Sequence, residues 1–198
     1  MTKVHVPLLV VLTGPSGAGK DSLLVRLKSQ DPSIFIVVNA TTRQPRPGER
    51  EGVDYHFVSK SEFERLLREG ELLEHALVYG QDKGVPRGPI RDALASGRDV
   101  LLRTDIQGAR TIKRLAPGAT TIFVSPPSDA ELRRRVRERG ADTQDQIKVR
   151  EETAMQEMAA APNFDYHVVN DDLDGCANEI LRIMSEERSR PDRDEIIV

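Results

Sequence analysis

Residues 8–22 read LLVVLTGPSGAGKDS, an apolar run that leads into a glycine-rich turn and a lysine. The run 8–12 is apolar at every position, which is typical of a strand covered on both faces. After the turn, Leu23, Leu24 and Leu27 recur at helical spacing. The stretch therefore predicts a buried parallel strand, a tight loop and a helix, in that order.

The loop has the spacing Gly14-x-x-x-x-Gly19-Lys20, which is the P-loop pattern. Its glycines let backbone N–H groups turn inward around phosphates, and the next helix points its positive end at them. The pattern predicts nucleotide binding, with a chance turn as the alternative. The residues predicted to bind the nucleotide are Gly14, Pro15, Ser16, Gly17, Ala18, Gly19, Lys20, Asp21 and Ser22.

Asp21 departs from the P-loop pattern, in which a Ser or Thr after the lysine ligates Mg²⁺. A carboxylate is also a hard oxygen ligand for Mg²⁺, directly or through water. Alternatively, the charge of Asp21 only favours the N-terminus of the helix. The sequence leaves both possibilities open.

The rest of the chain alternates short apolar segments with helical patterns, which predicts a three-layer α/β fold with a mainly parallel sheet. Apolar or strand segments are expected at 34–38, 54–59, 72–79, 99–105, 120–124 and 166–169. Helices are expected at 61–68, 89–95, 109–115, 129–139, 145–161 and 174–188, and Ser61 is expected to cap the first of these. Residues 40–95 break the alternation with loops, so they are interpreted as an inserted subdomain.

Composition excludes several classes of protein. The net charge is -3, which argues against the broad basic surface that nucleic acid or an anionic membrane would need. The single cysteine, Cys176, excludes an internal disulfide framework, and we expect it to be a small buried residue in a reducing, cytoplasmic setting. No apolar run approaches the roughly 18 residues that span a bilayer.

Asp105 follows the apolar residues 100–102 and resembles the acid at the end of a Walker B strand. The carboxyl end of a parallel strand faces the ligand crevice, so Asp105 is expected near Mg²⁺, possibly through water, or near an acceptor phosphate. Its alternative role is to cap the following helix.

Two groups of basic residues are candidates for phosphate contacts. Arg43 and Arg46 lie in a proline-stiffened loop shortly before Tyr55, and two restrained guanidinium groups with a hydroxyl suit a phosphate monoester. A second group, Arg133, Arg134, Arg135, Arg137, Arg139 and Arg150, lies around the polar segment 140–143. Such a run is usually a charged helix face, but here it could form a lid over a transferring phosphoryl group.

Taken together, these motifs resemble the guanylate kinase family. The matching segments are TTRQPRPGE at 41–49, GVDYHFV at 52–58, DIQGA at 105–109 and VVNDDL at 168–173. The resemblance runs from about residue 8 to residue 184. It implies a P-loop NTPase-like core at 1–39, 96–130 and 156–188, a GMP-binding insertion at 40–95, a helical lid at 131–155 and a tail at 189–198, all in one domain.

The resemblance implies transfer of the γ-phosphate of ATP to GMP or dGMP with Mg²⁺, without nucleic-acid or membrane partners and possibly as a homodimer. The implied catalytic residues are Lys20, Arg135, Arg139 and Arg150, and Asn170 is implied to lie by the adenine. The implied GMP-binding residues are Asn39, Arg43, Arg46, Tyr55, Glu74, Lys83, Val85 and Asp105. Glu74 would accept hydrogen bonds from guanine N1 and N2, which distinguishes guanine from adenine.

Four residues differ from the commonest pattern of the family. Asn39 and Val85 stand where Ser is usual, Lys83 where Tyr is usual, and Arg103 where Asp is usual. Together with Asp21, they resemble a plastid-type and related bacterial branch of guanylate kinases. Two other functions remain alternatives, a kinase of another phosphorylated acceptor such as ribose 1,5-bisphosphate and a non-catalytic guanylate-kinase-like scaffold.

Overall fold

The computed structural model describes residues 6–78, 80–138, 144–191, 193–194 and 196–198, without the side chains of 144–147. Its strands are β1 Leu9–Thr13, β2 Phe35–Ile36, β3 Ala40–Thr41, β4 His56–Phe57, β5 Leu72–Val78, β6 Gln81–Pro86, β7 Val100–Arg103, β8 Thr120–Ser125 and β9 Tyr166–Val169. Its helices are α1 Lys20–Gln30, α2 Lys60–Arg68, α3 Arg87–Ala95, α4 Ile106–Leu115, α5 Asp129–Arg137, α6 Gln144–Met158 and α7 Leu173–Ser189, with a short 3-10 turn at Ala161–Asn163.

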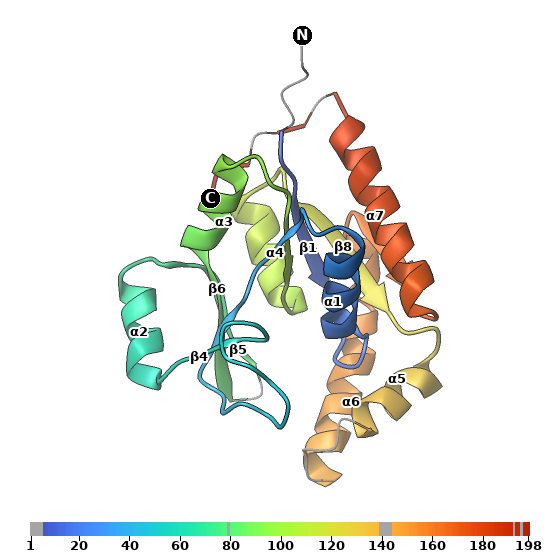
Figure 1. The fold of residues 1–198 in the computed structure, drawn as a ribbon. Coiled ribbons are helices and arrows are strands. Elements are labelled where there is room, and N and C mark those ends of the chain that lie inside the picture. Colours follow the sequence, from blue (N-terminus) through green and yellow to red (C-terminus); the bar gives the residue numbers. More distant parts are fainter. Residues whose placement is uncertain (1–5, 79, 139–143, 192, 195) are drawn as a thin grey trace.

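The core sheet is parallel throughout and has the order β2-β7-β1-β8-β9. Strand β1 lies at its centre, and all of its residues are buried. Val10 and Leu12 pack towards α1 and α7, whereas Leu9 and Val11 pack towards α3 and α4. The alternation gives each face of the sheet its own helical layer (Figure 1). The predicted three-layer α/β fold is confirmed.

A second, four-stranded sheet has the order β4-β3-β6-β5 and lies beside the core (Figure 1). Helix α2 covers it through a small cluster around Phe63 and Leu72. Helix α3 then returns the chain to the core, where Ile90 and Ala93 pack against residues of β7 and β1. On the other side, α5 and α6 pack together through Leu132, Val136 and Ala154.

The structure corrects several predictions in and around the inserted segment. Ser59, not Ser61, caps α2, because the Oγ of Ser59 accepts a hydrogen bond from the backbone N–H of Glu62. Strand β4 covers only His56–Phe57 of the predicted 54–59, and β2 only Phe35–Ile36 of 34–38. Strand β6 was missed, since its sequence QDKGVP has neither an apolar run nor alternation. It forms because β5 and β3 pair with it on either side.

Strand β3 was not predicted either. The other elements agree with the prediction to within a few residues at their ends. Cys176 is buried between α7 and the core, as expected. Within the residues that the structure describes, no helix has both the length and the apolar character needed to cross a membrane.

Candidate active site

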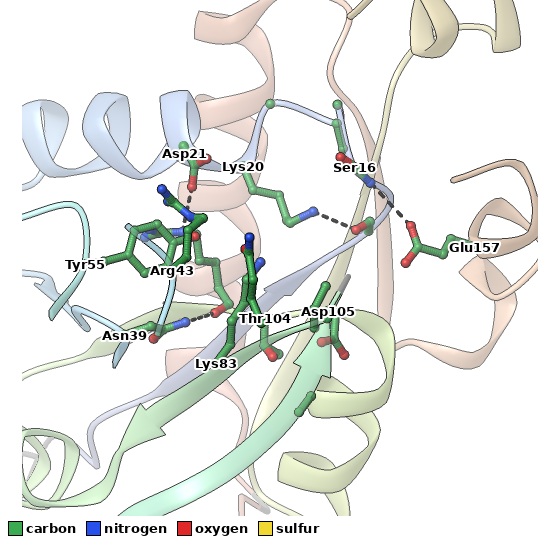
Figure 2. A pocket seen from close by; sticks show the side chains of 18 of the residues that line it. Ser16, Lys20, Asp21, Asn39, Arg43, Tyr55, Lys83, Thr104, Asp105 and Glu157 are labelled. Atoms are coloured by element: carbon green, nitrogen blue, oxygen red, sulfur yellow. Dashed lines mark hydrogen bonds and ion pairs between the residues drawn. The ribbon is translucent and has the colours of Figure 1, made fainter. Parts of the chain in front are cut away.

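A cleft of about 330 Å³ lies where the core sheet, the second sheet and the α5–α6 pair meet. Most of the predicted site residues line it: Gly14, Ser16, Gly17, Ala18, Gly19, Lys20, Asp21, Ser22, Asn39, Arg43, Arg46, Tyr55, Glu74, Lys83, Val85, Asp105, Arg135 and Arg150. Pro15 and Asn170 are not among its lining residues, and Arg139 lies outside the described residues. Residues far apart in the sequence are thus gathered around one cavity (Figure 2).

The loop between β1 and α1 has the geometry of a phosphate cradle. Gly14 has φ 138°, and a Cβ atom there would lie 2.1 Å from the carbonyl oxygen of Val124 on β8, so only glycine fits. The Nζ of Lys20 donates to the carbonyl oxygens of Gly14 at 2.6 Å and Pro15 at 3.0 Å. The ammonium group is therefore held across the mouth of the loop (Figure 2).

Asn170, which follows β9, braces this loop from behind. Its Nδ2 donates to the carbonyl oxygen of Ala18 at 2.8 Å, and it is 5% exposed. The backbone carbonyl oxygen of Asn170 accepts a hydrogen bond from the Nη2 of Arg135 at 3.1 Å. Arg135 is also ion-paired with Glu131. Asn170 thus connects the loop to Arg135 on α5.

Glu157 is a residue of the cleft that sequence reasoning missed. Its Oε2 accepts from the backbone N–H of Ser16 at 3.3 Å, so a carboxylate from the end of α6 meets the phosphate loop (Figure 2). Burial raises the pKa of Glu157, while Lys20 and the Ser16 N–H oppose the rise. In the sequence it is one acid among several on a charged helix, and no spacing singles it out.

Arg43 and Arg46, in the basic loop after β3, are both held by Glu49, a contact that the sequence did not predict. Both guanidinium Nη atoms of Arg43 bond the carboxylate of Glu49, and the guanidinium also lies over the Tyr55 ring, 5.1 Å from its centroid. The backbone N–H of Arg46 donates to the same carboxylate at 2.7 Å. Glu49 therefore orders the loop and offsets part of the charge of Arg43.

Glu74 on β5 is a carboxylate buried at the wall of the cleft and 5% exposed. Its Oε2 accepts from the Oγ1 of Thr104 at 3.3 Å, whereas its Oε1 has no hydrogen-bond partner among the described residues. Burial, with the nearby charge of Asp105, raises the pKa of Glu74 to about 7. A buried oxygen of this kind is suited to a ligand's N–H donors.

Asp105 stands at the carboxyl end of β7 and caps α4, because its Oδ1 accepts from the backbone N–H of Gly108 at 2.8 Å. It also lines the cleft. The capping role, which the sequence offered as the alternative, is therefore confirmed. A place near Mg²⁺ or an acceptor phosphate stays a prediction.

Gly108→Ala tests how tightly this corner is built. A Cβ at position 108 would lie 2.2 Å from the Oγ1 of Thr104 and 2.8 Å from the Oε1 of Glu74. We expect the variant to displace Glu74 and raise the acceptor KM about tenfold or more, the scale of one lost hydrogen bond to a charged group. Steady-state kinetics measures this, and Gly88→Ala, where a Cβ meets nothing within 4 Å, is the control. An unchanged acceptor KM would contradict the expectation.

Arg103 and Asp21, two of the residues that depart from the family pattern, meet in this cleft. The Nε of Arg103 lies 2.6 Å from the Oδ1 of Asp21, and its guanidinium lies over the ring of Tyr55. The side-chain amide of Asn39 donates to the carbonyl oxygen of Arg103 at 2.8 Å. Lys83 and Val85, the other two, lie on β6, where they pair with Ala76 and Glu74 of β5.

Comparison with known proteins gives consistent matches over nearly the whole chain. A family model described as guanylate kinase matches residues 7–187. The guanylate kinase of Carboxydothermus hydrogenoformans is 40% identical over 190 residues, which are 96% of this chain and 93% of that protein. The guanylate kinase of Parasynechococcus marenigrum is 49% identical over 176 residues, 89% of this chain and 97% of that protein.

A solved structure agrees with these matches. The crystal structure of guanylate kinase from Anaplasma phagocytophilum superposes with a TM-score of 0.81 at 34% sequence identity. The match covers 94% of this chain and 89% of that chain.

Proposed function

Because the chain belongs to the guanylate kinase family and is therefore a nucleoside monophosphate kinase, we propose that its cleft transfers the γ-phosphate of ATP to GMP or dGMP, with Mg²⁺, giving ADP and GDP or dGDP. One observation carries the assignment of the site. The same cavity is lined by the loop at residues 14–20 with its lysine and by Glu74, a buried carboxylate whose Oε1 has no hydrogen-bond partner among the described residues.

The donor ATP is proposed to bind along residues 14–22. Backbone N–H groups of the loop and the N-terminus of α1 would hold its phosphates, and Lys20 would leave the carbonyl oxygens that it now contacts to reach them. This loop supports the role because its glycine geometry keeps the backbone open. Asn170 is proposed to lie near the adenine while it braces the loop.

The acceptor GMP is proposed to bind between the two sheets. Its phosphate would meet Arg43, Arg46, Tyr55 and Lys83, and its guanine would meet Glu74, Asn39 and Val85. Both Glu74 and Asn39 are buried, and each has an oxygen without a hydrogen-bond partner among the described residues. Such oxygens suit the N1–H and N2–H groups of guanine, and adenine lacks this pair of donors.

In phosphoryl transfer the protein mainly positions the two nucleotides and stabilises charge. Lys20, Arg135 and Arg150 line the cleft from three elements and are proposed to act on the transferring group, together with Arg139, which lies outside the described residues. The acceptor already carries an anionic phosphate oxygen, so no protein side chain has to remove a proton from it. We propose that residues 40–95 and 131–155 act as the acceptor and lid parts around the core.

Mg²⁺ fits the oxygen donors of this cleft. Asp105 lines it and uses its Oδ1 for the helix cap, which leaves its other carboxylate oxygen for a metal-bound water. Asp21 is ion-paired with Arg103 through its Oδ1. When bound, Mg²⁺ neutralises charge on the β- and γ-phosphates.

The decisive experiment is a coupled assay of ADP release from ATP with GMP, dGMP, AMP, UMP and ribose 1,5-bisphosphate. We expect turnover with GMP and dGMP and little with the others. Turnover with the sugar and none with GMP would favour the other kinase assignment, and no turnover at all would favour a scaffold.

Lys83→Ala tests the lysine that replaces the usual tyrosine. Lys83 lies on β6 at the cleft, and we propose that it supplies a cation for the GMP phosphate. We expect the KM for GMP to rise about tenfold with a smaller change in kcat, because one charged contact is lost from binding. Kinetics with GMP varied at saturating ATP measures this, and an unchanged KM would remove Lys83 from the site.

We also propose a cytoplasmic location, where both nucleotides occur, and a possible homodimer, which light scattering of the purified protein tests directly.

A further inference from the structure

Arg103 at the end of β7 is a buried arginine that the function proposed above does not use. It is 8% exposed and lines the cleft. It touches three separate parts of the molecule, namely the first turn of α1 through Asp21, the segment before β4 through Asp54, and the ring of Tyr55. Burying a guanidinium group costs free energy unless its charge is paired and its N–H groups are hydrogen-bonded. The contacts of Arg103 therefore indicate a specific role for this side chain.

The contact with Asp21 is electrostatic. The Nε of Arg103 lies 2.6 Å from the Oδ1 of Asp21, but it has no well-aligned hydrogen bond among the described residues. The side chain of Asp21 is 51% exposed, so only one partner of the pair is buried. Asp21 directly follows the P-loop lysine, and its carboxylate is directed to the acceptor side of the cleft (Figure 2).

The other contacts of Arg103 tie it to the acceptor loop. Its Nη2 donates to the carbonyl oxygen of Asp54 at 2.7 Å, and its guanidinium carbon lies 4.7 Å from the centroid of the Tyr55 ring. Arg43 lies over the same ring at 5.1 Å. The position of Tyr55, a proposed ligand of the GMP phosphate, is therefore set by two stacked guanidinium groups.

We propose that Arg103 is a positioning residue that joins the first turn of α1 to the acceptor loop, and that Asp21 serves the acceptor site through Arg103 and is not a ligand of Mg²⁺. The chain of contacts runs from Asp21 to Arg103 to Tyr55. The sequence left open whether Asp21 ligates Mg²⁺ or only favours the N-terminus of the helix. In this proposal its role is instead to hold Arg103. The inference rests on the proposed function, since it concerns how that site holds GMP.

The experiment compares Asp21→Asn, Arg103→Met and the double variant, with Arg98→Met as the matched control. Arg98 precedes β7 at its other end, where it stacks on Phe35 and donates to the carbonyl oxygen of Ser33, away from the cleft. For each protein, the KM for GMP, the KM for ATP, kcat, the half-saturating Mg²⁺ concentration and the melting temperature are measured. Calorimetric binding of GMP without ATP or Mg²⁺ gives a readout that does not need turnover.

We expect each single variant to weaken GMP binding about tenfold, because both break the same link, and the double variant to be no more than about twofold worse than either single. The KM for ATP and the Mg²⁺ requirement stay within about twofold, and Arg98→Met behaves as wild type. Asp21→Asn changes a residue of α1, on the ATP side of the cleft, and is expected to weaken only GMP binding. A general loss of structure would weaken the binding of both nucleotides.

Two outcomes would overturn the inference. One is a changed Mg²⁺ requirement in Asp21→Asn with unchanged GMP binding, which would make Asp21 a metal residue. The other is effects that multiply in the double variant. If Arg103→Met does not fold, Asp21→Asn at its half-exposed position carries the test with the same two outcomes, together with Arg103→Lys, which keeps the charge without the planar stack. Wild-type protein that fails to phosphorylate GMP would instead refute the proposed function, and it is assayed first.

Discussion

Lys20→Ala is expected to lower kcat by at least about a hundredfold, the scale on which one donor to a developing charge is removed. The side chain reaches across the mouth of the phosphate loop, where its Nζ contacts the carbonyl oxygens of Gly14 and Pro15. In the proposed ATP complex, the same short reach would place the ammonium at the β- and γ-phosphates. No other residue of the loop between Gly14 and Ser22 is cationic, so no other side chain of the loop can substitute for it.

The change should act mainly on turnover. The backbone N–H groups of the loop remain, so ATP binding falls less than kcat does. Lys60→Ala is the control, because Lys60 is an exposed residue at the start of α2 and outside the cleft. Single-turnover kinetics with saturating ATP and GMP measures the chemical step, and near-normal turnover in Lys20→Ala would refute the P-loop assignment.

The core of this fold could be predicted from the sequence because its signals are local. A strand buried on both faces must be apolar at every position, and 8–12 meets that condition. The loop that follows needs glycine where a Cβ would strike β8, and Gly14 stands there. Local composition and local geometry agree, so the P-loop and its flanking elements were located within a few residues.

The second sheet could not be predicted in the same way. Strand β6 is held by β3 and β5, and its glycine, lysine and aspartate carry no strand signal of their own. Tertiary pairing decides its conformation, as is common for strands. The cap of α2 was predicted at Ser61 but lies at Ser59, because the two serines are only two positions apart and the sequence pattern does not distinguish them.

In the site too, some residues could be predicted from local sequence and others only from tertiary contacts. Lys20 and Asp105 came from motifs and Glu74 from the family resemblance, and all three line the cleft. Lys20 and Asp105 lie where a strand passes into a helix, a place that the fold fixes, whereas Glu74 lies within β5 and is marked by no motif of its own. Glu157 was missed because its importance arises only when α6 lies against the phosphate loop. The pairing of Arg103 with Asp21 was also invisible, since it joins residues from α1 and β7 that are far apart in sequence.

Glu74→Gln is expected to reduce the preference for GMP over AMP by at least about a hundredfold, within the range seen when a buried hydrogen-bonding group that reads the substrate is lost. In the proposed site the carboxylate would accept two N–H bonds from guanine, whereas a carboxamide offers only one acceptor oxygen and would place an N–H₂ group against the base. Glu74→Ala should lose the same preference. Competition between GMP and AMP in one assay gives the ratio of kcat/KM values, and Glu71→Gln, at an exposed position before β5, is the control. A retained preference for GMP would remove Glu74 from the guanine site.

The pKa of Glu74 adds a dependence on pH to this prediction. Burial and Asp105 raise that pKa to about 7, so below pH 7 the free enzyme holds the carboxyl group protonated. Guanine needs the ionised form, so the wild-type KM for GMP should rise towards about tenfold for each pH unit below 7. The phosphate of GMP also titrates near pH 6. Glu74→Gln isolates the contribution of the enzyme, because its KM keeps only the dependence that comes from the phosphate.

The same carboxyl group should make the wild-type enzyme less stable as the pH rises. Its pKa is about 7 in the folded protein, against 4.5 for an unperturbed glutamate side chain, so the folded state holds the proton more tightly than the unfolded chain does. The free energy of unfolding therefore falls as the pH rises from about 4.5 to about 7, by at most about 3 kcal/mol.

Glu74→Gln carries no charge, so it should melt above the wild type by up to about 5–10 °C at pH 8 and by much less at pH 5. Melting curves at the two pH values measure this difference, and an equal shift at both would mean that the buried carboxylate costs the fold nothing. A stabilising substitution that removes guanine recognition is what a residue placed for its ligand should give, because the Oε1 of Glu74 has no hydrogen-bond partner among the described residues and would gain one from GMP.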